Sequence, residues 1–363
     1  MPGLRGWRLG EDMSLMEIRE NIDLIDSKIL KLLYDRMERV LMAGKLKSQV
    51  EDTAREQEVL DRIKGNSTGL LNGDFIEKIY SEIFKESKTL QQRGLELIAF
   101  QGEHGAYGEV ASRAWNSNLV PVPCMQFAGV LEGVESGLYD YGIVPVENTL
   151  GGSVEQVNRL LLTTPLQVVG AVALRVRHCL LAVPGSDHRE IRTVYSHPQA
   201  LAQSRRFLLR NNLEPVPYHD TAGAAKMVAE QRPKGAAANA SELSAKLYSL
   251  EIIKENIADL ERNITRFLVL SETGNKEEGK KCSIIFSTEH KAGTLFRVLE
   301  VFAKENINLT RIESMPHEPG NYAFFLDFEG SHKDRKVVNA IAKVKKITST
   351  FKMMGCYNER NGA

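Results

Sequence analysis

Two cationic side chains occupy apolar positions of a long predicted helix. Apolar residues recur there in steps of three and four, at Leu15, Ile18, Ile22, Ile25, Ile29 and Leu32. The same steps continue to Arg36 and Lys47, which are eleven residues apart and therefore share one helix face. A guanidinium and an ammonium that face a core need anionic partners. The stripe predicts either a pocket for a small anion or an interhelix ion-pair network, for which the candidate acids are Asp23, Asp26, Glu38 and Glu56.

Three polar strings in the middle of the chain each follow a predicted strand and open a predicted helix. They are FQGEHGAYGE at residues 100–109, PVENTLGGS at 145–153 and YSHPQALAQ at 195–203. Backbone N–H groups at a helix N-terminus favour an anion, so three such ends in one cleft predict a dicarboxylate pocket. The GxxGxxG spacing of the first string does not match a nucleotide-binding loop. Taken singly, each string is also typical of a helix cap, and His197 before Pro198 is typical of a structural residue.

The elements that position these residues fall into three segments with different patterns. Residues 15–92 predict helices only: one of about 33 residues, or roughly 50 Å, a second at 53–64 capped by Asp52 or Thr53, and a third at 75–92. A helix of that length exceeds the core of a compact domain, so we expect a partner chain alongside it in a homodimer.

Residues 95–271 alternate short apolar runs with helices, which indicates a mainly parallel α/β sheet. Strands are expected at 95–100, 141–146, 166–174, 178–183, 192–196, 235–239 and 265–270. The apolar stretch near 168–183 suits a crossover between two lobes with a cleft between them. After a polar linker at 272–281, a βαββαβ pattern predicts a ferredoxin-like domain.

Composition limits the classes of protein. The chain has 363 residues, 42% hydrophobic and 26% charged, with 47 basic and 47 acidic side chains, which argues against disorder and against a broad nucleic-acid or anionic-membrane surface. The longest apolar region, 160–183, includes charged residues and is not a membrane span. The first twelve residues lack the apolar core of a secretory signal, and Met13 is an alternative start to Met1. Four widely spaced cysteines predict reduced thiols in a cytoplasmic protein.

The N-terminal strings IRENIDLIDSKILKLLYDR, GKLK, DTARE and ESKTLQQ resemble the all-helical chorismate mutase family. The resemblance implies a site in which Lys47 and Gln91 donate to the breaking ether oxygen of chorismate. It further implies substrate-binding roles for Arg19 (from the partner chain), Arg36, Asp52, Arg55, Glu56 and Ser87. The rearrangement is unimolecular, so holding a compact conformer and stabilising charge would suffice.

The strings GAYGE, PVENT, YSHPQA and TRF, in this order, resemble the prephenate dehydratase family across residues 95–271. The resemblance makes Thr265 the main catalytic residue and implies cleft positions for Glu147, Asn148, Ser196 and Gln203. A threonine hydroxyl can hydrogen-bond the departing ring hydroxyl of prephenate, with a proton relay through water or Glu147. Arg266 is either a substrate anchor or a strand-end ion pair.

The C-terminal strings AGTLFRVL and NLTRIESMP resemble ACT domains, which imply L-phenylalanine as a feedback inhibitor bound at a paired interface. The matching regulatory positions are Gly293, Thr294, Leu295, Glu313 and Ser314. A purely structural dimerisation module is the alternative.

Together these resemblances predict three domains: an intertwined all-α mutase at 14–92, a two-lobed α/β dehydratase like periplasmic binding proteins at 95–271, and a ferredoxin-like ACT domain at 281–357. The implied function is a bifunctional, cytoplasmic, homo-oligomeric enzyme of phenylalanine biosynthesis. It would convert chorismate to prephenate and prephenate to phenylpyruvate, without cofactor, metal, nucleic-acid or membrane partner. Two alternatives remain: a dehydratase whose helices only dimerise or regulate, and a non-catalytic two-lobed sensor.

Overall fold

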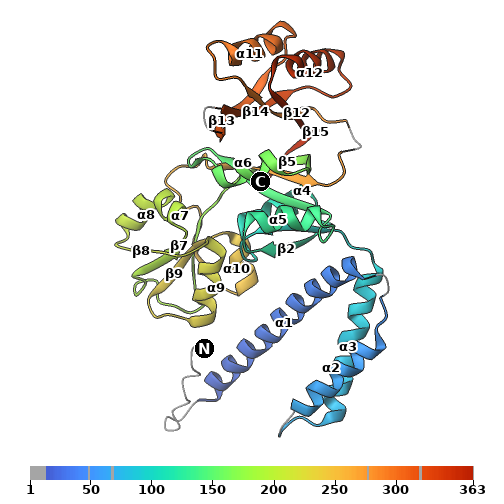
Figure 1. Ribbon diagram of the computed structural model, residues 1–363. Coiled ribbons are helices and arrows are strands. Elements are labelled where there is room, and N and C mark those ends of the chain that lie inside the picture. The colour runs from blue at the N-terminus through green and yellow to red at the C-terminus, as the bar shows by residue number, and fades with distance from the viewer. Residues whose placement is uncertain (1–13, 48–49, 67–68, 276–277, 319–320, 363) are drawn as a thin grey trace. The chain divides into compact units, whose positions relative to one another are not determined.

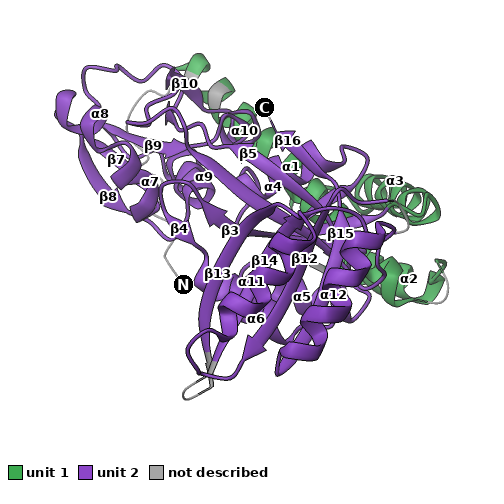
Figure 2. Cartoon of the chain, turned by 90° about the horizontal axis from the view of Figure 1, so that it is seen from above, with its two compact units in different colours: residues 1–95 green, residues 96–363 purple. Residues whose placement is uncertain are grey.

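The computed structural model describes residues 14–47, 50–66, 69–275, 278–318 and 321–362 (Figure 1). The two proposed start methionines, Met1 and Met13, and the segment judged not to be a signal therefore lie outside the described residues. The chain forms two compact units, residues 1–95 and residues 96–363 (Figure 2). Among the described residues, no helix is both long enough and apolar enough to cross a membrane.

The first unit consists of three helices, as predicted. They are α1 (Leu15–Leu46), α2 (Thr53–Asn66) and α3 (Gly73–Gln92). Asp52 caps α2 by accepting from the Arg55 N–H at 3.0 Å. Leu41, Ile76 and Phe84 are buried between helices, whereas the apolar stripe of the first half of α1 is exposed. A 32-residue helix with such a stripe does not bury its own apolar face within this unit.

The second unit contains two α/β lobes. The first lobe has a seven-stranded sheet in the order β16-β5-β11-β3-β1-β2, with β4 beside β3. Its strands are β1 (Leu97–Gln101), β2 (Val120–Cys124), β3 (Tyr141–Asn148), β4 (Gly152–Ser153), β5 (Gln167–Arg175), β11 (Ile264–Ser271) and β16 (Glu359–Gly362). Its helices are α4 (Tyr107–Trp115), α5 (Phe127–Glu135) and α6 (Glu155–Thr163).

The second lobe has a five-stranded sheet in the order β10-β6-β9-β7-β8. Its strands are β6 (Cys179–Ala182), β7 (Thr193–Ser196), β8 (Glu214–Pro217), β9 (Ala236–Ala240) and β10 (Glu251–Lys254). Its helices are α7 (Pro198–Gln203), α8 (Arg205–Arg210), α9 (Thr221–Gln231) and α10 (Glu242–Tyr248). The chain enters this lobe between β5 and β6 and leaves it between β10 and β11, which confirms the predicted crossover.

Both sheets are mixed, so the prediction of a mainly parallel sheet is wrong. The central strand β11 is antiparallel to both β3 and β5, and β6 is antiparallel to β9. The reason is the connection by which the chain returns from the second lobe. Strand β11 begins at the end of the sheet where β3 ends, so the two strands run in opposite directions. Strand β11 is buried over nearly its whole length, which its apolar sequence TRFLVL reflects.

The C-terminal part is the predicted βαββαβ unit. Its order is β12 (Lys281–Thr288), α11 (Thr294–Lys304), β13 (Leu309–Glu318), β14 (Asn321–Glu329), α12 (Arg335–Ile347) and β15 (Thr350–Tyr357). The sheet order β13-β14-β12-β15 is that of the ferredoxin-like fold. After β15 the chain returns to the first lobe, where β16 pairs in parallel with β5.

The prediction of four reduced cysteines is wrong for one pair. Cys282 on β12 and Cys356 on β15 are directly opposite in the strand register and form a disulfide. They are 74 residues apart in sequence, and only the antiparallel pairing of the first and last strands of this domain brings them together. Cys124 and Cys179 are thiols.

Candidate active sites

A cavity of about 610 Å³, here called the interlobe cavity, lies among the strand-to-helix turns of the two lobes. It is lined by Gln101, Gly102, Ala106, Tyr107, Gly108, Phe127, Ile143, Pro145, Asn148, Gly151, Gly152, Ser153, Val154, Glu155, Gln156, Val176, His178, His197, Gln199, Ala200, Gln203, His219, Asp220, Thr221, Thr265 and Phe267. The starts of α4, α6 and α7 all contribute, as the sequence predicted, and the start of α9 joins them. No lysine or arginine is among these lining residues, so backbone N–H groups and neutral side chains are the donors available to an anion.

Thr265 and Asn148 face each other at the wall of this cavity. They are opposite in the register of β11 and β3, and Asn148 Nδ2 donates to Thr265 Oγ1 at 2.8 Å. Asn148 is held in turn by the backbone, because its Oδ1 accepts from the N–H groups of Leu150 and Gly151 at 2.9 and 2.7 Å. With its oxygen already accepting a bond, Thr265 can direct its own O–H proton to a molecule in the cavity.

Gln203 also lines the cavity and connects to two residues that sequence reasoning did not select. Its Oε1 lies 2.9 Å from Asn263 Nδ2 and 2.9 Å from His178 Nε2. Asn263 is fully buried and His178 nearly so. The available sequence signal was a polar residue at the edge of each apolar strand, Asn263 before TRFLVL and His178 before CLLAV. His197 behaves as expected of a structural residue, because its Nδ1 accepts from the Gln199 N–H at the start of α7.

Glu147 and Ser196 are not among the residues that line the cavity, and the roles that the resemblance implies for them stay a prediction. Glu147 follows the strand alternation to the face of the sheet opposite to that of Asn148. Its carboxylate lies 3.4 Å from Arg311 Nε and 3.8 Å from Arg266 Nη1. Ser196 is fully buried and donates to the carbonyl oxygen of Asn239.

Arg266 forms the ion pair that was the alternative to a substrate anchor, which corrects its assignment as a substrate-binding residue. Its guanidinium binds Asp327, Glu359 at 2.6 Å and the Tyr357 hydroxyl at 2.8 Å, all from the C-terminal part of the chain. Burial opposes the charge, but Tyr357, Asp327 and Glu359 together hold the pKa of Arg266 above its usual value. Arg266, which follows Thr265 in the chain, therefore connects β11 to the C-terminal part of the chain.

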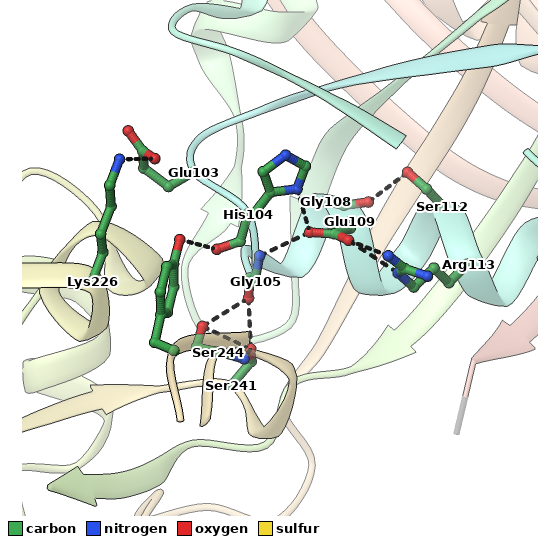
Figure 3. A network of polar contacts seen from close by, with 11 residues as sticks. Glu103, His104, Gly105, Gly108, Glu109, Ser112, Arg113, Lys226, Ser241 and Ser244 are labelled. Carbon is green, nitrogen blue, oxygen red and sulfur yellow. Dashed lines mark hydrogen bonds and ion pairs between the residues drawn. The ribbon is translucent and has the colours of Figure 1, made fainter. Parts of the chain in front are cut away.

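The loop before α4 joins the two lobes through polar contacts, as Figure 3 shows. Gly102 and Ala106 of this loop line the cavity. The buried carboxylate of Glu109 accepts from the Gly105 N–H at 2.8 Å and from Arg113. Burial opposes ionisation, but His104, Gly105 and Arg113 lower the pKa of Glu109. The carbonyl of Gly105 accepts from the hydroxyls of two second-lobe residues, Ser241 and Ser244.

A close approach at Gly105 explains why this loop position is a glycine. Its φ is +90°, and a Cβ there would come within 2.9 Å of the Cα of Ser244. An ion pair between Lys226 and Glu103 adds a further contact between the lobes at 2.7 Å.

In the first unit, the structure brings Arg36, Ser87 and Gln91 together between α1 and α3. Arg36 Nη1 donates to Ser87 Oγ at 2.6 Å, and its guanidinium lies 5.5 Å from the centre of the Phe84 ring. Gln91 Nε2 donates to the Val40 carbonyl at 2.7 Å. Burial lowers the pKa of Arg36. Within the described residues, no carboxylate is paired with Arg36, so the interhelix ion-pair alternative does not account for it.

The other predicted mutase residues lie at the ends of α1 and α2. Lys47 pairs with Asp52 at 3.6 Å, and Arg55 binds Glu58 at 2.6 Å. Glu56 pairs with Lys88 of α3 at 3.2 Å. The Arg19 side chain is exposed on α1, as a residue contributed to a partner chain would be.

The predicted regulatory residues lie on two separate elements. Gly293, at φ +82°, precedes α11. Thr294 donates to the carbonyls of Glu289 and Lys291. Leu295 packs against the core of this domain. Glu313 and Ser314 lie on β13, the edge strand, with β14 between it and β12. The two sets lie on different elements of this domain, and their role stays a prediction.

Three family models match the chain in sequence order. Residues 18–92 match chorismate mutase type II, residues 98–275 match prephenate dehydratase, and residues 283–346 match the ACT domain.

Curated relatives match part or nearly all of the chain. The bifunctional chorismate mutase/prephenate dehydratase of Escherichia coli (strain K12) is 32% identical over 373 residues, covering 96% of this chain and 97% of the relative. Arogenate dehydratase 2 of Petunia hybrida is 39% identical over 284 residues, covering 73% of this chain and 72% of the relative.

Two solved structures are similar to the second unit. The prephenate dehydratase from Arthrobacter aurescens, in complex with L-Phe, is 28% identical with a TM-score of 0.68 over 72% of this chain and 89% of that chain. GqqA, described as a novel type of quorum-quenching acylase, is 34% identical with a TM-score of 0.68, over 72% of this chain and 97% of that chain.

Proposed function

Because the chain belongs to the family of bifunctional chorismate mutase/prephenate dehydratases, we propose that each compact unit carries one of the two reactions. The enzyme rearranges chorismate to prephenate and converts prephenate to phenylpyruvate. The first reaction belongs to the Arg36 site between α1 and α3, and the second to the interlobe cavity. The observation that carries the assignment is the Thr265–Asn148 pair, which leaves a hydroxyl proton free at the wall of a cavity rich in helix N-termini.

In the dehydration, the C–O bond to the ring hydroxyl and the C–C bond to the ring carboxylate both break. Carbon dioxide leaves, the ring keeps the electron pair and becomes aromatic, and the departing hydroxyl takes up one proton to form water. Thr265 donates a hydrogen bond to that oxygen while charge develops on it. Because Glu147 pairs with Arg311 and Arg266 and is not among the residues that line the cavity, we expect solvent to supply this proton, which reaches the departing oxygen through water.

In the rearrangement, Arg36 holds a carboxylate of chorismate. A half-buried guanidinium without a carboxylate partner in the described unit is a strong site for a substrate carboxylate. The Ser87 hydroxyl fixes the guanidinium and Lys47 supplies a second positive charge. Lys47 and Gln91 donate to the ether oxygen that breaks, and Arg19 of the second chain completes the site.

A pair of single variants tests the assignment of two reactions to two sites. Arg36→Ala should lower chorismate turnover by about 10²-fold or more, the loss seen when a charge-stabilising donor is removed, and leave prephenate turnover unchanged. Thr265→Val should do the reverse. Loss of both activities in either folded variant would contradict separate sites. Chorismate that disappears only at its uncatalysed rate in the parent, while prephenate is still consumed, would favour helices that only dimerise or regulate. Turnover of neither compound in the parent would favour a non-catalytic sensor.

Arogenate is a second candidate substrate of the interlobe cavity. The match to an arogenate dehydratase, 39% identical over 73% of this chain, supports it. The mutase match of residues 18–92 favours prephenate, which that reaction would produce within the same chain. Measuring kcat/KM for both compounds with one preparation decides between them, and a higher value for arogenate would overturn the proposal of prephenate.

The exposed stripe on α1 supports a homodimer. Ile22, Ile25 and Ile29 are each more than half exposed in one chain, and Arg19 lies beside them. A second copy of this helix would bury the stripe and bring its Arg19 to the Arg36 site. Ile25→Glu should weaken the association of two chains in light scattering and lower chorismate turnover while the dehydratase persists. Chorismate turnover equal to that of the parent would contradict the proposal.

L-Phenylalanine is the proposed effector of the ACT domain, bound where Gly293–Leu295 of one chain meets Glu313 and Ser314 of another. The family match and the L-Phe complex of the similar dehydratase support this. Isothermal titration of Gly293→Val should show weakened phenylalanine binding relative to the parent, and equal binding would refute the site. The cytoplasmic location remains a prediction.

A further inference from the structure

The side chains around Thr265 form a row whose hydrogen-bond directions are fixed from one end. The backbone N–H groups of Leu150 and Gly151 can only donate, and both point at Oδ1 of Asn148. The oxygen of that carboxamide must therefore face the turn. Its NH2 group must face the other way, toward Thr265 and toward Asn263 Oδ1, which lies 2.8 Å from Nδ2.

The direction is passed on to Gln203. Asn263 accepts on its oxygen, so its Nδ2 faces outward along the row and donates to Oε1 of Gln203 at 2.9 Å. Asn263 is fully buried, and reversing its carboxamide would place like groups together at both ends. Gln203 thus presents its oxygen to the protein.

His178 is the second donor to the same oxygen. Its Nε2 lies 2.9 Å from Gln203 Oε1, and since that oxygen is an acceptor, the hydrogen must be on Nε2. On the other side of the ring, Nδ1 lies 3.0 Å from the Tyr107 hydroxyl, which donates its proton to the Arg177 carbonyl at 2.7 Å. His178 is 2% exposed, so the ring is fixed by packing as well as by the bond to Gln203.

The group left over is the NH2 of Gln203. Among the described residues Nε2 of Gln203 has no hydrogen-bond partner, and the residue lines the interlobe cavity beside Thr265, Asn148 and His178. We infer that His178 is a positioning residue of the dehydratase site, which holds the Gln203 carboxamide so that its NH2 group donates to an oxygen of the bound substrate. The inference rests on the proposed function, because it assigns the cavity to the dehydration.

The electrostatics of the buried ring agree with this role. Burial lowers the pKa of His178, and the bond to Gln203 only partly offsets that effect. The neutral ring has one hydrogen to give, and the fixed direction of the row requires it on Nε2. The groups that face the ring are Tyr107 from α4 and Gln203 from α7, and neither carries a charge at neutral pH.

Three substitutions of His178 separate positioning from packing. His178→Phe keeps the ring and removes both nitrogens, and His178→Asn places polar atoms near Nδ1 but none near Nε2. His178→Gln places an N–H near Nε2. With prephenate, the first two should lower kcat/KM by about 10–100-fold, the loss expected when a substrate-binding group is misplaced by about 1 Å. His178→Gln should recover most of the activity. His188→Phe, at an exposed histidine of the same lobe, is the matched control and should be unchanged.

A double-mutant cycle shows whether His178 acts through Gln203. In Gln203→Met the donor is already absent, so adding His178→Phe should cause less than about a twofold further loss. Losses that multiply in the double variant, or a His178→Phe enzyme within twofold of the parent, would overturn the inference. Equal loss in all three His178 variants would also overturn it, since that pattern indicates packing alone.

A readout without substrate separates this inference from the proposed function. The side-chain NH2 signal of Gln203, identified in a nitrogen-15 NMR spectrum by its absence in Gln203→Met, should shift in His178→Phe and return in His178→Gln. An unmoved signal would overturn the inference even in an active enzyme. A protein that shows the shift but does not consume prephenate would contradict the proposed function and leave the positioning of Gln203 by His178 supported.

Discussion

Asp327→Asn should destabilise the second unit strongly, because it leaves a buried arginine with a reduced set of anions. Arg266 and Asp327 are 7% and 3% exposed at their side chains. Arg266 and Asp327 belong to a cluster of six charged side chains that balance in charge. The cations are Arg266, Lys281 and Arg311, and the anions are Asp327, Glu359 and Glu147. The substitution is nearly isosteric, so the change is mainly one of charge.

The expected magnitude follows from the burial of the pair. Removing one partner of a buried ion pair costs about 3–5 kcal/mol, and we take about 3 kcal/mol because Glu359 still binds Arg266 at 2.6 Å. For a unit of this size, that corresponds to a Tm lower by roughly 6–12 °C. The measurement is differential scanning calorimetry of the whole chain at pH 7, following the transition of the second unit.

Glu289→Gln is the control for this experiment. Its pair with Lys291 lies in the same domain but is exposed on both sides, so we expect no measurable change in Tm. A Tm for Asp327→Asn within about 2 °C of the parent would refute the reasoning, because it would show that Arg266 does not depend on Asp327 for its charge. An equal decrease in the Glu289→Gln control would refute it as well.

Three further predictions concern single positions in the second unit. Gly151→Ala should lower prephenate kcat/KM by about tenfold with chorismate turnover unchanged. The new Cβ would lie 1.9 Å from Nε2 of Gln199 and would move that side chain, which lines the cavity. Steady-state kinetics with both substrates checks this, and equal losses in both would contradict it. Asn158→Ala should lower the free energy of unfolding by about 1–3 kcal/mol, because the fully buried Asn158 accepts from Arg311 and donates to Ser153. Urea unfolding measures this loss, and a midpoint urea concentration equal to that of the parent would contradict it. Burial raises the pKa of Glu359, but Arg266 and Lys281 lower it by more, so its folded pKa lies below the usual 4.5. The stabilising contribution of Glu359 is present above 4.5 and is lost as the pH falls through the folded pKa. Tm measured from pH 5 to pH 3 should therefore fall less steeply in Glu359→Gln than in the parent, whereas parallel curves would contradict the assignment.

Much of the fold could be predicted because its signals are local. The three-and-four spacing from Leu15 to Leu32 determines a long amphipathic helix, and the apolar run TRFLVL determines a buried strand. The C-terminal βαββαβ order also follows from short-range patterns. Strand β16 could not be found this way, because ERNG has no apolar alternation and its partner strand β5 is distant in sequence.

The site was predictable to the extent that neighbours in sequence remain neighbours in space. Thr265 and Asn148 lie in the cavity as expected, but Arg266 and Glu147 point to the opposite face because adjacent strand residues alternate. Arg266 pairs with Asp327 and Glu147 pairs with Arg311, both distant in sequence, so no local pattern shows that this face is covered. His178 and Asn263 were missed for a similar reason. In sequence each is an ordinary residue at the edge of a strand, and only the folded structure brings both to Gln203.

The most direct test of the account is the identity of the products that the unmodified protein forms from chorismate alone. Proton NMR of the reaction mixture should show prephenate appearing first and then phenylpyruvate, with release of carbon dioxide. Chorismate that decays only at its uncatalysed rate, together with added prephenate that is not consumed, would contradict the central claim.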